Sequence, residues 1–100
     1  MHYIIVTELQ SPGEDPVCKV QGLPSADVNT LESCFLDLHL TCKNLPEFIE
    51  VDFAAVHVLN ILCGLDFRYR VISQCMAIEI TAIGGRTMKI QKIFWTMARE

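Results

Sequence analysis

The pattern of apolar and polar residues divides the chain into short strand-like and helix-like segments. The chain opens with an apolar, β-branched run at residues 3–9, which predicts a strand with Glu8 turned outward. Residues 10–16 contain two prolines and a glycine, a composition typical of a loop. The alternating run at 17–20 predicts a second strand. We therefore expect these two strands to form a hairpin.

The following segment has two interpretations. Ser25 is suited to cap a short helix over residues 25–33. Over residues 35–42, leucines alternate with polar residues, which is the period of a strand, and we favour this interpretation. The alternative is a longer helix, because apolar residues with helical spacing run through the same region. These residues are Val28, Leu31, Phe35, Leu38 and Cys42.

The middle of the chain predicts another strand and a second helix. Residues 48–51 have strand character, and Asp52 stands where a helix N-cap belongs. Residues 53–63 are apolar at nearly every position except His57 and Asn60. A helix of this kind is covered on more than one side. In a chain of 100 residues, we expect another subunit to supply the second cover.

The last third predicts a long hairpin. Residues 70–81 and 88–97 have strand character, and Gly84 and Gly85 supply the turn, because adjacent glycines accept positive φ at little cost. The alternation slips at Gln91–Lys92, which predicts a β-bulge there. The order β-β-α-β-α-β-β predicts an α+β fold: a single domain, residues 1–100, whose mainly antiparallel sheet has two helices packed on it.

The composition points to association with other protein chains. Of the 100 residues, 51% are hydrophobic and 20% are charged. A domain of this size buries about 60–70% of its unfolded surface, so some apolar surface is left over. Large exposed apolar patches usually mark association surfaces. One face of the predicted hairpin collects large apolar residues: Ile72, Met76, Ile78 and Ile80.

Charge and length exclude several classes of protein. High apolar content with a net charge of −4 excludes a disordered tail. Eight basic against twelve acidic residues give no electrostatic basis for binding nucleic acid. The most apolar stretch, residues 53–65, is shorter than the about 20 residues of a membrane-spanning helix. The first ten residues do not have the pattern of a signal peptide, so we expect the protein in the cytoplasm or the nucleus.

Candidate catalytic and metal chemistry is sparse. Five cysteines without a secretory signal indicate reduced thiols. The best metal-like cluster, Cys34, His39 and Cys42, lacks a nearby fourth ligand. None of the three histidines, His2, His39 and His57, neighbours an obvious nucleophile in the sequence. We therefore predict no catalytic residues, no metal and no cofactor.

The glycine pair has a purely structural interpretation and a functional one. The residues after Gly84 and Gly85 are strand-like, whereas phosphate-binding glycine loops precede a helix. In the structural interpretation, the glycines form a tight turn and Arg86 is solvated. In the functional one, glycine lets a small ligand approach the backbone and Arg86 pairs with its carboxylate.

Five segments of the chain follow the pattern of one known family. They are residues 1–7 (MHYIIVT), Val51-Asp52 with Val58-Leu59, Leu62 and Phe67, residues 70–73 (RVIS), the turn 84–87 (GGRT), and the ending 94–100 (FWTMARE). Together they resemble the GTP cyclohydrolase I feedback regulatory protein family. The chain departs from the family in having extra residues around 35–45 and 74–82, and in having Arg86 where the family's turn has Gln.

The resemblance implies a regulatory function. Proteins of this family are not enzymes; they form pentameric rings that cap GTP cyclohydrolase I and transmit inhibition by tetrahydrobiopterin and stimulation by phenylalanine. Phenylalanine binds at the interface of the two proteins. The resemblance therefore implies a homopentamer with a phenylalanine pocket formed by these residues: Gly84, Gly85, Arg86 and Thr87, with Leu9 and Gln10 as neighbours.

Two alternatives from other classes stay open. The first is a small oligomeric α+β interaction subunit or binding domain that has a different partner and no effector. The second is a small enzyme with a cysteine nucleophile.

Overall fold

The computed structural model describes the backbone of residues 1–100 and the side chains of all of them except Ile83. The chain forms these elements: β1 (His2–Gln10), β2 (Val17–Gln21), α1 (Ser25–Asp37), β3 (Cys42–Asn44), β4 (Ile49–Val51), α2 (Ala55–Cys63), β5 (Arg70–Ile83) and β6 (Arg86–Arg99). The predicted α+β class is confirmed, and β3 is an additional short strand.

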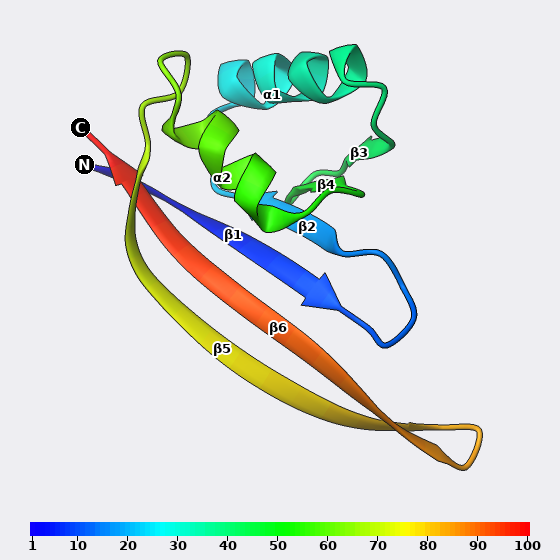
Figure 1. Ribbon diagram of the computed structural model, residues 1–100. Coiled ribbons are helices and arrows are strands. Elements are labelled where there is room, and N and C mark those ends of the chain that lie inside the picture. Colours follow the sequence, from blue (N-terminus) through cyan, green and yellow to red (C-terminus); the bar gives the residue numbers. More distant parts are fainter.

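All six strands form one antiparallel sheet in the order β3-β4-β2-β1-β6-β5. The predicted hairpin of β1 and β2 is confirmed, with Val6 opposite Val20. The first and last strands pair along the whole length of β1, from His2 opposite Arg99 to Gln10 opposite Gln91. This pairing brings the two ends of the chain side by side (Figure 1).

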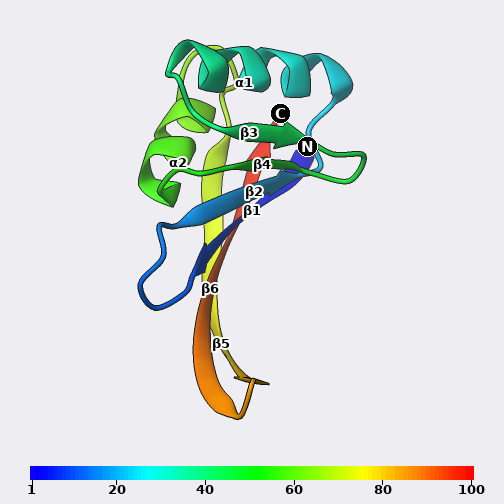
Figure 2. The same ribbon diagram turned by 90° about the vertical axis from the view of Figure 1, so that its right-hand side faces the viewer.

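Both helices cover one face of the sheet near β1–β4, and the β5–β6 hairpin continues beyond them as a two-stranded ribbon (Figures 1 and 2). The core lies between the helices and the sheet. Its buried residues are Ile4, Val6, Cys18, Val20, Leu31, Phe35, Ile49, Val51, Ala55, Val58, Leu62, Phe67, Tyr69 and Met97. No described side chain in the far half of the ribbon belongs to this core.

Glu8 is buried beneath α2, so the prediction that it turns outward was wrong. Only 6% of the residue is exposed. Its Oε2 accepts a hydrogen bond from the Ala55 backbone N–H at 2.7 Å, and its Oε1 accepts one from Gln10 Nε2 at 3.1 Å. The first N–H groups of a helix have no partner within the helix, and the helix dipole favours negative charge there. Glu8 therefore holds the start of α2 against the sheet.

Asp52 does not cap α2, contrary to the prediction. The helix begins at Ala55, with Ala54 in the N-cap position and no side-chain cap hydrogen bond from that residue. The backbone N–H of Asp52 instead donates to the carbonyl oxygen of Thr41. The cap comes from Glu8, a residue distant in sequence that the sheet places under the helix.

The strand predicted over residues 35–42 is wrong, and the open helical alternative is closer to the structure. Helix α1 continues to Asp37, and the chain turns at His39, whose φ is +59°. Phe35 is fully buried beside Leu31, one helical turn earlier. Burying that aromatic ring on the sheet outweighs the strand-like alternation of the leucines.

Two further local predictions were wrong. Helix α1 begins at Ser25, but Pro24 occupies the N-cap position and makes no side-chain cap hydrogen bond. The irregularity of the long hairpin lies between Val71 and Ser73, not at Gln91–Lys92. The extra residue in β5 places Val71 on the same face as Met76, because Val71 pairs with Met97 and Met76 with Ile93.

Helix α2 buries one face and exposes another. Ala55, Val58 and Leu62 are buried against the sheet, whereas Val56 is 58% exposed. A second subunit on the exposed face of this helix stays a prediction.

We expect Glu8→Ala to lower the free energy of unfolding by about 1–3 kcal/mol, because the buried N–H of Ala55 would lose its acceptor. The matched control is Glu14→Ala, which removes an exposed carboxylate from the β1–β2 loop and is expected to change that free energy by less than about 0.5 kcal/mol. Urea unfolding at equal protein concentration measures both. Equal losses in the two variants would contradict the capping role.

Candidate functional site

The predicted glycine turn forms the tip of the β5–β6 ribbon. Gly84 and Gly85 have φ values of +59° and +78° and connect Ile83 to Arg86, which pair across the hairpin. Two positive φ values in a two-residue loop match the right-handed twist of the flanking strands. Gly84, Gly85, Arg86 and Thr87 are all exposed. The structure therefore brings these four candidate residues together, as expected for contiguous residues at a turn.

The space around the tip is open. A Cβ atom placed on Gly84 or Gly85 would have no described heavy atom within 4 Å outside the neighbouring residues. A single chain thus provides the backbone of the turn and the Arg86 side chain, but no wall opposite them. A pocket at this tip needs a second chain to complete it.

Leu9 and Gln10 lie far from the tip within one chain. They end β1 opposite Lys92 and Gln91 of β6. The turn lies at the start of β6, beside Arg86, which is five residues before Gln91. At the rise of an antiparallel strand, this separation is about 17 Å. The two side chains also point to opposite faces of the sheet because they are adjacent in a strand. The six candidate residues therefore form no single intramolecular pocket.

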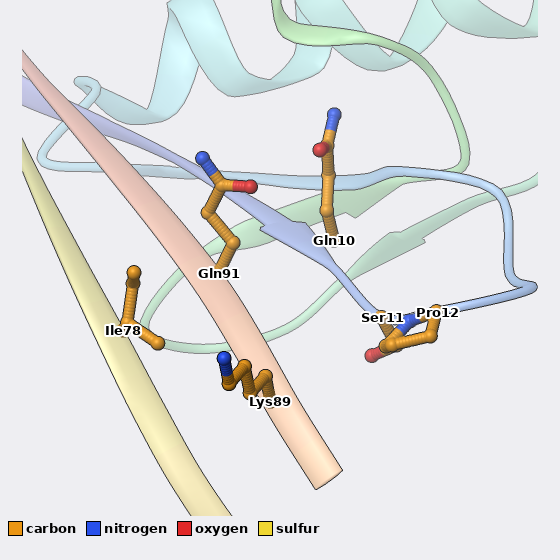
Figure 3. A pocket seen from close by; sticks show the side chains of 6 residues that line it. All are labelled: Gln10, Ser11, Pro12, Ile78, Lys89 and Gln91. Carbon is orange, nitrogen blue, oxygen red and sulfur yellow. The ribbon is translucent and has the colours of Figure 1, made fainter.

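A surface hollow of about 300 Å³ does form where β1 ends against the ribbon. It is lined by Gln10, Ser11, Pro12, Ile78, Lys89 and Gln91. Figure 3 shows these side chains spread between the β1–β2 loop and the two ribbon strands. The Lys89 ammonium offers hydrogen-bond donors beside the apolar Ile78, while the amide nitrogens of Gln10 and Gln91 already donate to Glu8 and Met76. Such a hollow suits a small molecule that carries both a carboxylate and an apolar group.

A second polar cluster ties the chain ends to α1. Arg99 bonds to the Asp27 carboxylate, donates from Nη1 to the carbonyl oxygen of Phe67 at 2.9 Å, and lies 4.5 Å from the Tyr69 ring centroid. Burial raises the pKa of the Tyr69 phenol, and the nearby Arg99 charge partly offsets that effect. Sequence reasoning missed this cluster, because its members come from three distant segments.

A larger hollow of about 490 Å³ adjoins the Arg99 cluster. Its lining residues are Asp66, Phe67, Arg68, Arg70, Arg99 and Glu100. Arginines and carboxylates share this lining, and Arg99 is already occupied by Asp27. The arrangement is that of a charged surface beside the C-terminal end of the chain.

The histidines show no catalytic arrangement among the described side chains. His57 stacks on Phe53 with ring centroids 4.6 Å apart. His2 Nε2 donates to the carbonyl oxygen of Gly22 at 2.7 Å, and His39 is exposed after the end of α1. In the described part of the chain, no group of three His, Cys, Asp or Glu residues is placed to hold a metal ion.

The cysteines differ strongly in their environments. All five are free thiols; Cys18 is buried, while Cys63 and Cys75 are exposed. Burial, together with the nearby Glu8 carboxylate, raises the pKa of Cys18 to about 12. The thiolate is the nucleophilic form, so this cysteine is unreactive at neutral pH.

Comparisons with known proteins show a shared fold. No protein-family model matches the sequence, and no curated protein matches it either. A solved structure of a conserved kinetoplastid-specific protein from Trypanosoma cruzi is similar, with a TM-score of 0.61 and 16% identity. The similarity covers 100% of this chain and 97% of that one. Among the described residues, no helix is both long and apolar enough to span a bilayer.

We expect a thiol-specific disulfide reagent at pH 8 to modify Cys63 and Cys75 rapidly in the folded protein, and Cys18 only after unfolding. Counting the released chromophore before and after denaturant measures this. As a control, Cys18→Ser should leave the number of rapidly reacting thiols unchanged. Rapid modification of Cys18 in the native protein would contradict the described burial.

Proposed function

We propose that this chain is a non-catalytic regulatory protein that binds GTP cyclohydrolase I and mediates its inhibition by tetrahydrobiopterin and its stimulation by phenylalanine. The five sequence segments that resemble the feedback regulatory family supply the identity of the partner. We expect the protein to act in the cytoplasm or the nucleus as a homo-oligomer; the resemblance implies a pentamer.

One geometric observation supports this proposal most directly. The four residues to which the resemblance assigns the effector pocket, 84–87, lie at an exposed tip with open space around both glycines. A ligand held there by one chain alone would be bound by a turn and one arginine. A pocket at the tip is therefore suited to an interface, where a partner chain supplies the opposite wall.

The physical basis of such regulation is linkage. An effector that binds at the interface of two proteins stabilises the complex over its separated parts. The coupling is reciprocal, so complex formation raises the affinity for the effector by the same factor. Arg86 is the residue that we expect to hold the effector's carboxylate, since a guanidinium can bind it through two hydrogen bonds.

A second candidate function is an oligomeric interaction subunit with a different partner and no effector. The separation of Leu9 and Gln10 from the turn favours this second candidate, because the two residues cannot line one pocket with the turn within a single chain. The exposed apolar side chains of the ribbon serve association whether or not an effector exists. The two candidates differ in partner and in effector dependence, and one experiment separates them.

We expect phenylalanine to raise the melting temperature of a mixture of this protein with GTP cyclohydrolase I, and to leave each protein alone unchanged. Differential scanning fluorimetry of the three samples measures the shift. Arg86→Ala should abolish it, whereas Lys43→Ala, which removes an exposed charge on the distant β3 edge, should retain it. Absence of both binding and a shift would overturn the regulatory proposal and favour the second candidate.

A further inference from the structure

Strand β5 forms an unusually open edge of the sheet. It stands at one end of the strand order, and every residue from Arg70 to Ile80 is exposed. Natural proteins protect such edges with prolines, charges or bulges. Beyond the irregularity at Ile72, this strand contains no proline or glycine, and its single charge, Glu79, is bound to Lys92 of β6 at 2.8 Å. The outer backbone groups of β5 are thus available to another strand.

A row of large apolar side chains accompanies this edge. Met76, Ile78 and Ile80 alternate along β5 and share one face of the ribbon, with exposed fractions of 58%, 60% and 67%. These exposed fractions show that neither helix covers the three side chains, and the ribbon as a whole extends beyond both helices (Figure 1). The opposite face of the same stretch carries small or polar residues, Cys75, Ala77 and Glu79 among them.

The surface area of the chain indicates how large a contact is missing. The chain exposes 6426 Å², whereas a compact monomer of 11.3 kDa exposes about 5700 Å². The difference, about 700 Å², is close to what each partner contributes to a standard interface. The radius of gyration is 14.2 Å, against about 13 Å for a compact domain of this length. The excess therefore has the size of one interface.

We propose that β5 pairs antiparallel with β5 of a second copy of this chain, about a two-fold axis at Ile78. The apolar row Met76, Ile78 and Ile80 is symmetric about its centre. A two-fold pairing centred there places Ile78 opposite its own copy and Met76 opposite Ile80 of the second copy. Paired residues in antiparallel strands point to the same face, so the two apolar rows join into one.

The neighbouring registers are poorer. Centring the axis on Glu79 places two carboxylates directly opposite each other, which is destabilising. Centring it on Ala77 places Ile80 opposite Gln74, so only Met76 and Ile78 of the apolar row face apolar residues of the second copy. In the register centred on Ile78, Glu79 faces Ala77 of the second copy and keeps its bond to Lys92. The sequence of β5 thus favours one register for self-pairing.

This inference goes beyond the proposed function and rests on the β5 edge alone, independently of GTP cyclohydrolase I. It agrees with the pentamer that the resemblance implies only if two five-membered rings join into an assembly of ten chains. A two-fold contact closes with two copies, whereas a ring uses different surfaces on each subunit. If rings form through another surface, the β5 contact joins them in pairs. The assembly therefore contains an even number of chains.

The first test is the mass of the assembly by light scattering at micromolar concentration. We expect the wild-type protein to be a dimer or a larger even oligomer, and Ile78→Lys to have half its mass, because two lysines would meet at the axis. The matched control is Leu36→Lys on α1, where the replaced side chain is 58% exposed. This control should keep the wild-type mass. Far-ultraviolet circular dichroism checks that each variant is folded.

The second test measures the register by disulfide formation. In a background in which Cys63 and Cys75 are replaced by serine, Ile78→Cys should form a covalent dimer under mild oxidation, because residues facing each other at the axis lie within disulfide range. Ile80→Cys is the control, since the two copies of residue 80 would be about 14 Å apart. We expect most Ile78→Cys chains to cross-link and few Ile80→Cys chains to do so.

Several results would overturn the inference: a wild-type monomer, an odd oligomer such as a pentamer, an unchanged mass in Ile78→Lys, or equal cross-linking of both cysteine variants. These outcomes are separate from those of the cyclohydrolase experiment. An even oligomer without any response to phenylalanine would overturn the regulatory proposal and support β5 pairing. A phenylalanine-dependent complex built on a pentamer would support the regulatory proposal and overturn β5 pairing.

Discussion

The structure depends on the pairing of the first strand with the last. β1 lies between β2 and β6, and its ladder with β6 runs from His2–Arg99 to Gln10–Gln91. This ladder brings Arg99 to Asp27 of α1 and to the Phe67 carbonyl, so the chain ends are tied to the helical layer. The same strand carries Glu8 under the start of α2. The sheet and the helices are therefore joined through β1.

The pairing also determines which surfaces are left open. β6 is occupied by β1 on one side and by β5 on the other, so β5 becomes the edge. β1 ends at Gln10, whereas β5 and β6 continue past it to the turn at Gly84 and Gly85. A two-stranded ribbon cannot bury either of its faces by itself, and such a hairpin is only marginally stable in water. Both proposals concern this ribbon: its tip as part of an effector site, and its edge as a contact with a second copy.

The sequence predicted the elements whose signals are local. β1, the β1–β2 hairpin, the glycine turn and the α+β class all follow from alternation, turn residues and element order. The four residues of the candidate turn site were found together because they are contiguous. Leu9 and Gln10 were not joined to them, because the register between β1 and β6 decides where β1 ends along the ribbon. That register depends on the whole sheet, so no local pattern contains it.

Tertiary structure decided the points at which local signals conflict or are silent. Phe35 fits both a strand and a helical stripe, and its burial beside Leu31 selected the helix. Asp52 was predicted to cap α2 because it immediately precedes the predicted helix in the sequence. The hydrogen bond to Ala55 instead comes from Glu8, which lies 47 residues earlier and is placed beneath the helix by the sheet. The apolar surplus was evident from composition alone. Alternation along the last third also indicated an apolar face on the hairpin. Folding decided that this face stays uncovered beside an edge strand, because only the completed core shows which apolar side chains it leaves out.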